Sequence, residues 1–376
     1  MDKRRFIKTF STGVLSWSFI PSLFSKPIPL PANQKTKNWL WTRPNVNWKS
    51  DEWKLLFENM NKAGIKALLP EVYNGHKAHF EHPNPLVPSA DHTLERIIPL
   101  AKAADIEVHA WMWTMPCNNP AIIAKHPDWY AVNRKGESAR DRPAYVNYYK
   151  FLDPCNPEAV EFVKGNVEAL GKISELDGIH LDYVRLPDVI LAEGLQPKYG
   201  IVQDQEYPEY DYSYSDLCRA SFMEEYGIDP MDIEDPANHQ EWVEFRYNSI
   251  SNMVNNHLVP TAKNYGKTIT AAVFPNWQSV RQAWHTWNLD GFLPMLYNNF
   301  YNQPVDWIGD QVAAAQGRLS SNKKPIYSGL FIPQLNPTDL EKAISVSLQN
   351  NAQGYALFSQ GALKDEHWKT LIQLRS

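Results

Sequence analysis

The residues whose types are best suited to catalysis lie at the end of a short apolar stretch within residues 177–187. Alternation along a strand places His180 and Asp182 on one face, with apolar side chains on the other. A carboxylate at the end of a buried parallel strand is typical of a substrate-binding site. The plainer alternative is that Asp182 caps the next loop or forms a structural ion pair with Arg185.

The chemistry that these residue types favour is glycoside hydrolysis. That reaction needs one carboxylic acid to protonate the leaving oxygen and one carboxylate to act as nucleophile or base. We expect Asp182 to be the carboxylate, with Arg185 or His180 holding it ionised. Glu71 is the candidate proton donor, because apolar residues surround it in the sequence and an apolar setting favours a protonated carboxyl group. A salt bridge on the rim is the alternative for Glu71. Four other acids could donate the proton instead: Asp153, Asp188, Glu193 and Asp204.

Other polar and aromatic side chains also follow the apolar stretches of the chain. Their flat rings and hydrogen-bonding groups suit the faces and hydroxyl groups of sugars, although each aromatic residue could belong to the core instead. The residues predicted to bind substrate are Tyr73, Asn74, His109, Trp111, Trp113, His180, Tyr183, Arg185, Asn276, Trp277, Tyr297 and Asn298.

Strands and helices that alternate along the chain must position these residues. Strands are expected near residues 38–43, 65–73, 106–113, 177–183, 268–274, 291–297, 325–330 and 354–358. A helical pattern follows each of them, including one over 278–287 after the fifth strand. Eight such units favour a single (β/α)8 barrel of the α/β class over a doubly wound sheet. A long segment rich in acids and tyrosines, about 188–215, is expected as an insertion after the fourth strand.

Composition narrows the possible partners. A formal net charge of -5 leaves no basic surface for nucleic acid, whereas 14 Trp, 18 Tyr and 15 Phe suit a carbohydrate ligand. The three cysteines, Cys117, Cys155 and Cys218, lack the spacing of a zinc site and allow at most one disulfide. We expect no cofactor, because phosphate-binding glycine motifs are absent from the sequence.

A metal-dependent hydrolase is the competing use of the same residues. His109, His180 and Asp182 could meet at a zinc or iron ion, and His76 and His79 offer further nitrogen ligands. The sequence contains no HxH or HExxH motif, and the strand histidines could instead be hydrogen-bonded core residues.

The first thirty residues have the pattern of an export signal. A basic run at residues 3–8 precedes a moderately apolar stretch over 9–24, and the pair Arg4–Arg5 resembles a twin-arginine signal. The apolar stretch is short for a membrane span. We therefore expect an exported, periplasmic protein with a catalytic domain over 31–376 and no stable membrane span in the mature chain. An N-terminal segment that stays attached to the membrane is the alternative.

Residues 177–183 and Pro187 resemble the Asp-Gly-Ile-His-Phe-Asp-Asp-Tyr…Pro signature of the glycosyl-hydrolase-like family 10 proteins, a bacterial (β/α)8 group distinct from the family 10 xylanases. Shorter resemblances lie at residues 109–111, 126–129, 152–154, 294–297 and 356–359, so the likeness covers most of residues 38–375.

The resemblance implies an exported carbohydrate hydrolase, since members are associated with glycans, including bacterial cell-wall strands. Carried over by residue, it supports Asp182 as the catalytic carboxylate, with His180 beside it. Tyr183 takes the place of the second Asp of the signature, Arg185 that of an aromatic residue, and Glu71 stands where Gln is more usual. These departures leave the proton donor open and keep a non-catalytic glycan-binding barrel as an alternative.

Overall fold

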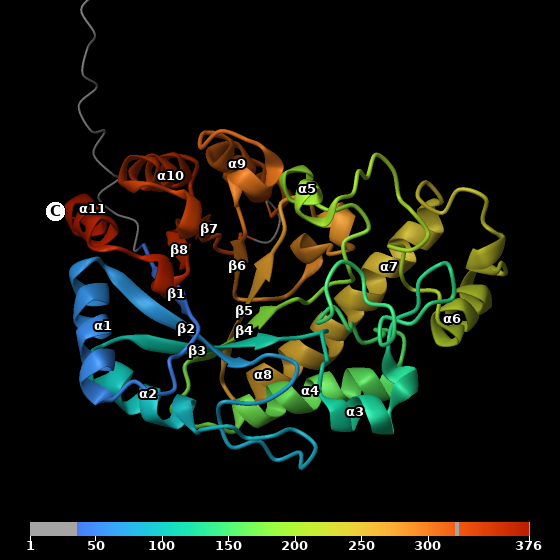
Figure 1. The fold of residues 1–376 in the computed structure, drawn as a ribbon, viewed down its shortest axis with the longest axis horizontal. Helices are drawn as coiled ribbons and strands as arrows, with labels where there is room; N and C mark the ends of the chain where they lie inside the picture. Colours follow the sequence, from blue (N-terminus) through green and yellow to red (C-terminus); the bar gives the residue numbers. More distant parts are fainter. Residues whose placement is uncertain (1–35, 320–322, 376) are drawn as a thin grey trace, which may run out of the picture. The chain divides into compact units, whose positions relative to one another are not determined.

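Eight parallel strands form the centre of the part of the chain that the structure describes (Figure 1). The computed structural model describes residues 36–319 and 323–375, so the predicted export signal over residues 1–30 lies outside the described residues. The strands are β1 (Asn38–Thr42), β2 (Ile65–Tyr73), β3 (Glu107–Trp113), β4 (Gly178–Asp182), β5 (Thr268–Val273), β6 (Gly291–Pro294), β7 (Ser328–Phe331) and β8 (Tyr355–Phe358).

The sheet closes on itself. Its strand order is β6-β5-β4-β3-β2-β1-β8-β7, so β6 and β7 are the ends. Met295 forms a parallel bridge with Gly329, and the backbone N–H of Leu296 donates to the carbonyl oxygen of Gly329 at 2.9 Å. The (β/α)8 barrel predicted from the alternation of strands and helices is therefore confirmed.

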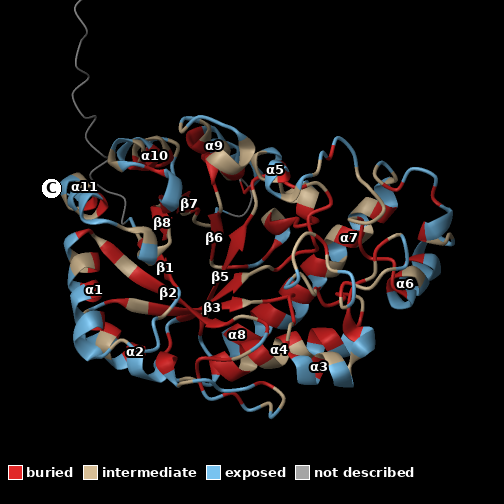
Figure 2. Ribbon diagram, in the orientation of Figure 1, coloured by how far each residue is buried: buried red, intermediate tan, exposed pale blue. Residues whose placement is uncertain are grey.

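Helices lie around the barrel, and others lie farther out in the long connections that follow β3 and β4; the buried faces of the helices are drawn in red in Figure 2. They are α1 (Ser50–Lys62), α2 (Thr93–Ala103), α3 (Pro120–Lys125), α4 (Pro157–Gly171), α5 (Gln196–Tyr199), α6 (Asp216–Tyr226), α7 (Gln240–Asn252), α8 (Val259–Asn264), α9 (Trp307–Arg318), α10 (Pro337–Gln349) and α11 (Asp365–Arg375). A π-helical turn, η4 (Met253–Leu258), joins α7 to α8. No helix within residues 36–319 or 323–375 is long and apolar enough to cross a membrane.

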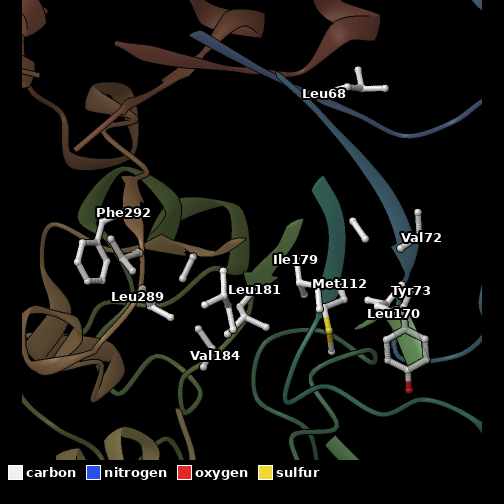
Figure 3. Packing of buried hydrophobic residues seen from close by; sticks show 14 of the residues in the cluster. Leu68, Val72, Tyr73, Met112, Leu170, Ile179, Leu181, Val184, Leu289 and Phe292 are labelled. Atoms are coloured by element: carbon white, nitrogen blue, oxygen red, sulfur yellow. The ribbon is translucent and has the colours of Figure 1, made fainter. Parts of the chain in front are cut away.

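The two faces of the strands build two separate cores. One lies inside the barrel and combines bulky indoles with small residues: Trp39, Trp41, Ala67, Leu69, Trp111, Ala272, Leu293 and Ala356. The other lies between strands and helices, where Met112 and Ile179 of the strands pack in one cluster with Leu170 of α4 (Figure 3). Successive strand residues enter different cores because their side chains alternate in direction.

Helix α4 leads the chain back to β4. The side chain of Asn156 accepts hydrogen bonds from the backbone N–H groups of Glu158 and Ala159, and Pro157 occupies the first helical position. Both features favour a helix start. Buried Val163 and Val167 then fasten the helix to the barrel wall. The chain thus enters β4 in a fixed position and carries Asp182 to the far end of that strand.

The helix predicted over residues 278–287 is wrong. Two short 3-10 turns, η5 (Trp277–Val280) and η6 (Trp284–Thr286), occupy this segment. Arg281 adopts a left-handed conformation with φ of 51°, which interrupts a right-handed helix. The side chain of Gln282 then bonds the backbone instead, accepting from the N–H of Phe274 and donating to the carbonyl oxygen of Val184.

The insertion after β4 is tied to the barrel by covalent and ionic links. Cys155, ahead of α4, is disulfide-bonded to Cys218 of α6, and Cys117 is a buried free thiol. The prediction of at most one disulfide is therefore confirmed. Arg246 of α7 forms a buried ion pair with Asp211 of the insertion. These links make the insertion a fixed part of the wall above β4.

Candidate active site

Asp182 is the last residue of β4, and both of its carboxyl oxygens accept hydrogen bonds. Oδ2 accepts from the indole Nε1 of Trp111 at 3.0 Å, and Oδ1 accepts from the backbone N–H of Tyr183 at 2.7 Å. Burial raises the pKa of Asp182 to about 6, and the nearby Glu71 acts in the same direction. The two hydrogen bonds and the positive charge of Arg185 oppose this rise.

Glu71 lies near the end of β2 and is 8% exposed. Its Oε2 accepts from the guanidinium Nε of Arg43 and from the indole Nε1 of Trp113, each at 3.2 Å. Arg43 directly follows β1, and its side chain lies 5.5 Å above the ring of Trp111 and 5.6 Å above that of Phe358. Glu71 therefore has a cationic partner at the mouth rather than the apolar surroundings that its sequence neighbours predicted.

Strand β3 connects the two carboxyl groups. Glu71 of β2 lies in register with Trp111, and Asp182 of β4 lies in register with Trp113. The indole hydrogen bonds run diagonally to these pairs, from Trp111 to Asp182 and from Trp113 to Glu71. Two carboxyl groups and their donors thus gather at the C-terminal end of three adjacent strands, where barrel enzymes carry their chemistry.

Aromatic rings form the walls of this mouth. Trp113 packs against Tyr183 with ring centroids 4.8 Å apart and against Tyr148 at 5.6 Å. Tyr148 is 42% exposed and offers the most accessible ring of this group. On another side Tyr297 packs against Phe358 at 5.9 Å, and the negative charge of Asp182 helps burial to raise the pKa of the Tyr297 hydroxyl. Such rings suit the apolar faces of sugars.

Comparison with known proteins identifies the family of the chain. The family model described as Glycosyl hydrolase-like 10 matches residues 72–345. The chain belongs to this family. The resemblance identified from residues 177–187 is therefore confirmed. A search of curated proteins found no match.

Solved structures of glycoside hydrolases show the same fold. The PgaB (BpsB) glycoside hydrolase domain of Bordetella bronchiseptica matches with a TM-score of 0.69 at 14% identity, covering 92% of this chain and 99% of that one. The catalytic domain of a Paenibacillus polymyxa β-amylase gives 0.66 at 11% identity over 91% and 98%. A Marinomonas ef1 β-galactosidase gives 0.64 at 11% identity, over 90% of this chain and 58% of that one. Asp182 lies within residues 72–345, the range that matches the Glycosyl hydrolase-like 10 model, whereas Arg43 and Glu71 lie before residue 72.

The two strand histidines of this Glycosyl hydrolase-like 10 chain lie below the mouth. His180 is fully buried, and its Nδ1 is 2.9 Å from the hydroxyl of Thr270. His109 lies in register with Gly178 at the start of β4, and its Nε2 is 2.8 Å from Oε2 of Glu107. Burial lowers the pKa of both imidazoles. The structure therefore does not bring either histidine to the barrel mouth.

Tyr73 also points away from the mouth. The register between β2 and β3 shifts between Glu71 and Tyr73, so that Tyr73 pairs with Met112. This irregularity turns Tyr73 into the outer core, where it is 2% exposed and packs in the cluster of Met112 and Leu170 (Figure 3). A bulge of this kind reverses the face that simple alternation predicts.

Arg185 is buried rather than placed on the rim. Its guanidinium forms an ion pair with Asp188 at 2.9 Å, donates to the hydroxyl of Tyr149 at 3.2 Å and lies 4.8 Å above the ring of Phe274. The side chain is 2% exposed. The structure therefore does not place Arg185 on the rim, where the sequence predicted that it would meet substrate. Its charge still acts on Asp182.

Four other predicted binding residues support the loops above the barrel. Asn74 accepts from two backbone N–H groups of its own turn, and Asn298 donates to the carbonyl oxygen of Gln303. Asn276 accepts from the hydroxyl of Tyr301. Trp277 packs between Tyr247 of α7 and His285, outside the barrel mouth.

The alternative proton donors lie elsewhere. Asp153 is buried beside the disulfide, where it bonds the hydroxyl of Ser215 and where burial raises its pKa to about 6. Asp188 is engaged by Arg185, and Glu193 and Asp204 are exposed. None of the four contacts Asp182 through a hydrogen bond within the described residues.

The residues of the metal alternative do not converge. His79 faces Asp91 at 2.7 Å, and His76 faces the carbonyl oxygen of Asn118. Among residues 36–319 and 323–375, the one group with metal-ligand spacing is Asp153, Cys155 and Cys218. Its two sulfur atoms are joined in the disulfide and offer no thiolate.

Three residues of the mouth were not predicted from the sequence as site residues: Arg43, Tyr148 and Phe358. Arg43 and Phe358 follow or end strands that the sequence analysis had identified, so their strand-end positions were a usable signal. Tyr148 had no such signal, because it lies in a long connection whose path only the folded chain defines.

Proposed function

We propose that this protein hydrolyses glycosidic bonds of a poly- or oligosaccharide, with Asp182 and Glu71 as its catalytic pair. The observation that carries the proposal is that two carboxyl groups share one barrel mouth and that Asp182 has a pKa raised to about 6. Unequal environments are the usual way in which two carboxyl groups divide the roles of acid and base. The aromatic walls of Trp113, Tyr148 and Tyr183 supply surfaces for sugar rings.

The contacts favour the opposite assignment of roles from the one that the sequence predicted. Among the described residues, no cation lies within hydrogen-bonding distance of Asp182, and its pKa is raised, which suits a proton donor. Glu71 has the guanidinium of Arg43 beside it, which stabilises a negative charge and suits a nucleophile or base. Asp182 would therefore protonate the leaving oxygen, and Glu71 would attack the sugar or activate a water molecule.

The test is cleavage of a panel of neutral, uronic-acid, sulfated and cell-wall glycans by the purified protein. Asp182→Asn and Glu71→Gln should each reduce turnover about 100- to 10 000-fold. Asp310→Asn removes an exposed charge on α9 and should leave turnover unchanged. Cleavage that survives in both mouth variants would rule out this catalytic pair. Binding of a glycan without any cleavage by the native protein would favour the non-catalytic glycan-binding barrel.

We further propose that the protein works in the periplasm after export. The Cys155–Cys218 disulfide supports an oxidising compartment, because such bonds are rare in the cytosol. Fusion of residues 1–37 to a reporter should deliver that reporter to the periplasm, and Arg4→Lys together with Arg5→Lys should retain it in the cytoplasm if the twin-arginine route is used.

A further inference from the structure

The indole groups of Trp111 and Trp113 stand out because each bonds a different carboxyl group. They lie two residues apart on β3, so their side chains leave the same face of the strand. Trp111 donates to Oδ2 of Asp182, and Trp113 donates to Oε2 of Glu71. One rigid strand therefore contacts the candidate acid on one neighbour and the candidate base on the other.

Trp111 is poorly suited to stack on a sugar. It is 1% exposed, Arg43 lies over its ring, and Phe358 packs edge-on at 6.0 Å. The part of Trp111 that meets the reacting groups is its N–H. This contact gives the indole a different use from the one that its strand-end position predicted.

We propose that Trp111 and Trp113 are paired positioning residues, which hold Asp182 and Glu71 at a fixed separation; this inference rests on the proposed hydrolase function. The oxygen pattern supports the pairing. Oε2 of Glu71 accepts from both Arg43 and Trp113, which leaves Oε1 without a partner among the described residues. Oε1 is then the oxygen that remains available to the sugar or to the attacking water.

A neutral donor suits Asp182 better than a cation does. The N–H of Trp111 orients the carboxyl group, but it stabilises the ionised form less than a guanidinium or ammonium group would. Asp182 thus keeps its geometry and can still be protonated near pH 6. Arg43, the cation of the mouth, is placed on Glu71 instead.

The first test uses the native protein and requires no glycan. Labelling with 15N-tryptophan reports each indole N–H, and the resonance of Trp111 should shift with an apparent pKa near that of Asp182. The shift should disappear in Asp182→Asn. A Trp111 resonance that does not respond to pH between 4 and 8, or that responds unchanged in Asp182→Asn, would overturn the proposal.

The second test removes each N–H in turn. Trp111→Phe keeps an aromatic ring but should raise the pKa of Asp182, read by 13C NMR of its carboxyl group, by about one pH unit. Trp113→Phe should leave that pKa near its native value and lower kcat with little change in KM. Trp368→Phe is the matched control, because this indole lies on α11 and packs against the core between strands and helices. It should change neither quantity.

These readouts separate the two proposals. An unchanged Asp182 pKa in a folded Trp111→Phe protein overturns the positioning role, whatever the activity. Should Trp111→Phe fail to fold, the native 15N titration decides alone. A shifted pKa in a protein that cleaves none of the tested glycans supports the hydrogen-bond pairing and counts against the hydrolase proposal.

Discussion

Glu71 and Asp182 lie near enough to each other that the charge of Glu71 adds to burial in raising the pKa of Asp182. The two residues stand on β2 and β4, on either side of β3. Like charges at one site disfavour simultaneous ionisation, so the pair holds a proton more readily than an isolated aspartate would. Among the described residues, Arg43 forms an ion pair with Glu71 and none with Asp182, so the cation of the mouth lies beside only one of the two carboxyl groups.

The nature of the leaving group should separate the two roles. A glycosyl substrate whose leaving group is a very weak base, such as a dinitrophenolate, needs no proton from the enzyme. Asp182→Asn should therefore lose about 100-fold or more with a natural glycan and much less with such an activated substrate. Glu71→Gln should lose activity with both. The reverse pattern, measured as kcat/KM, would assign the acid to Glu71.

The pH dependence of kcat/KM should report the protonation state of Asp182. With a pKa of about 6, an acid role requires the protonated form, so activity should fall as pH rises above about 6. Were Asp182 the base, activity would rise through the same region. The measurement is a profile from pH 4 to 9, and the limb near pH 6 should be absent with an activated leaving group.

Stability should depend on pH through the same residue. The pKa of Asp182 is raised in the folded chain, from 3.8 to about 6, so its favourable contribution is complete below pH 3.8 and is lost as pH rises through 6. Asp182→Asn removes this loss. Relative to the native protein, the variant should gain up to about 3 kcal/mol between pH 4 and pH 8. Melting curves at both pH values measure the gain, and an equal difference at the two would contradict it.

Removal of the disulfide should destabilise the insertion. Cys155 and Cys218 are 63 residues apart, and closing a loop of that length contributes about 4 kcal/mol in the chain-entropy description. The double variant Cys155→Ser/Cys218→Ser should melt earlier and should lose its sensitivity to reductant. Cys117→Ser is the control, because that thiol is free. It should retain the response of the native protein to dithiothreitol.

Gly178 should tolerate no side chain. A Cβ atom at this position would lie 2.2 Å from Nδ1 of His109 and 2.7 Å from the carbonyl oxygen of Thr268. Gly178→Ala should therefore cost about 1–3 kcal/mol through overpacking. Gly165→Ala, in α4, meets no atom within 4 Å and should instead stabilise by about 0.5–1 kcal/mol. Denaturant titration of both variants tests the contrast.

The barrel could be predicted from the sequence because its strands are recognised from patterns of neighbouring residues. Apolar stretches bounded by turn residues identify strands without knowledge of their partners, and eight alternations leave few topologies. The segment after β5 was predicted wrongly as a helix. Arg281 is in the left-handed conformation there, and the side chain of Gln282 forms hydrogen bonds with the backbone. Those bonds reach Phe274 and Val184, and no local pattern contains them.

The sequence by itself determined the barrel fold and the position of Asp182 at the end of β4. Strand periodicity and the position of a strand end depend on neighbouring residues, so both can be recognised without the fold. Only the tertiary structure decided which polar residues face the mouth. A shift in register between β2 and β3 directs Tyr73 into the outer core. Arg185 is buried in the protein interior. Arg43, which follows β1, forms an ion pair with Glu71. Charge, burial and hydrogen bonding act between residues that are distant in the chain, so the environments of the two carboxyl groups exist only once the barrel has closed.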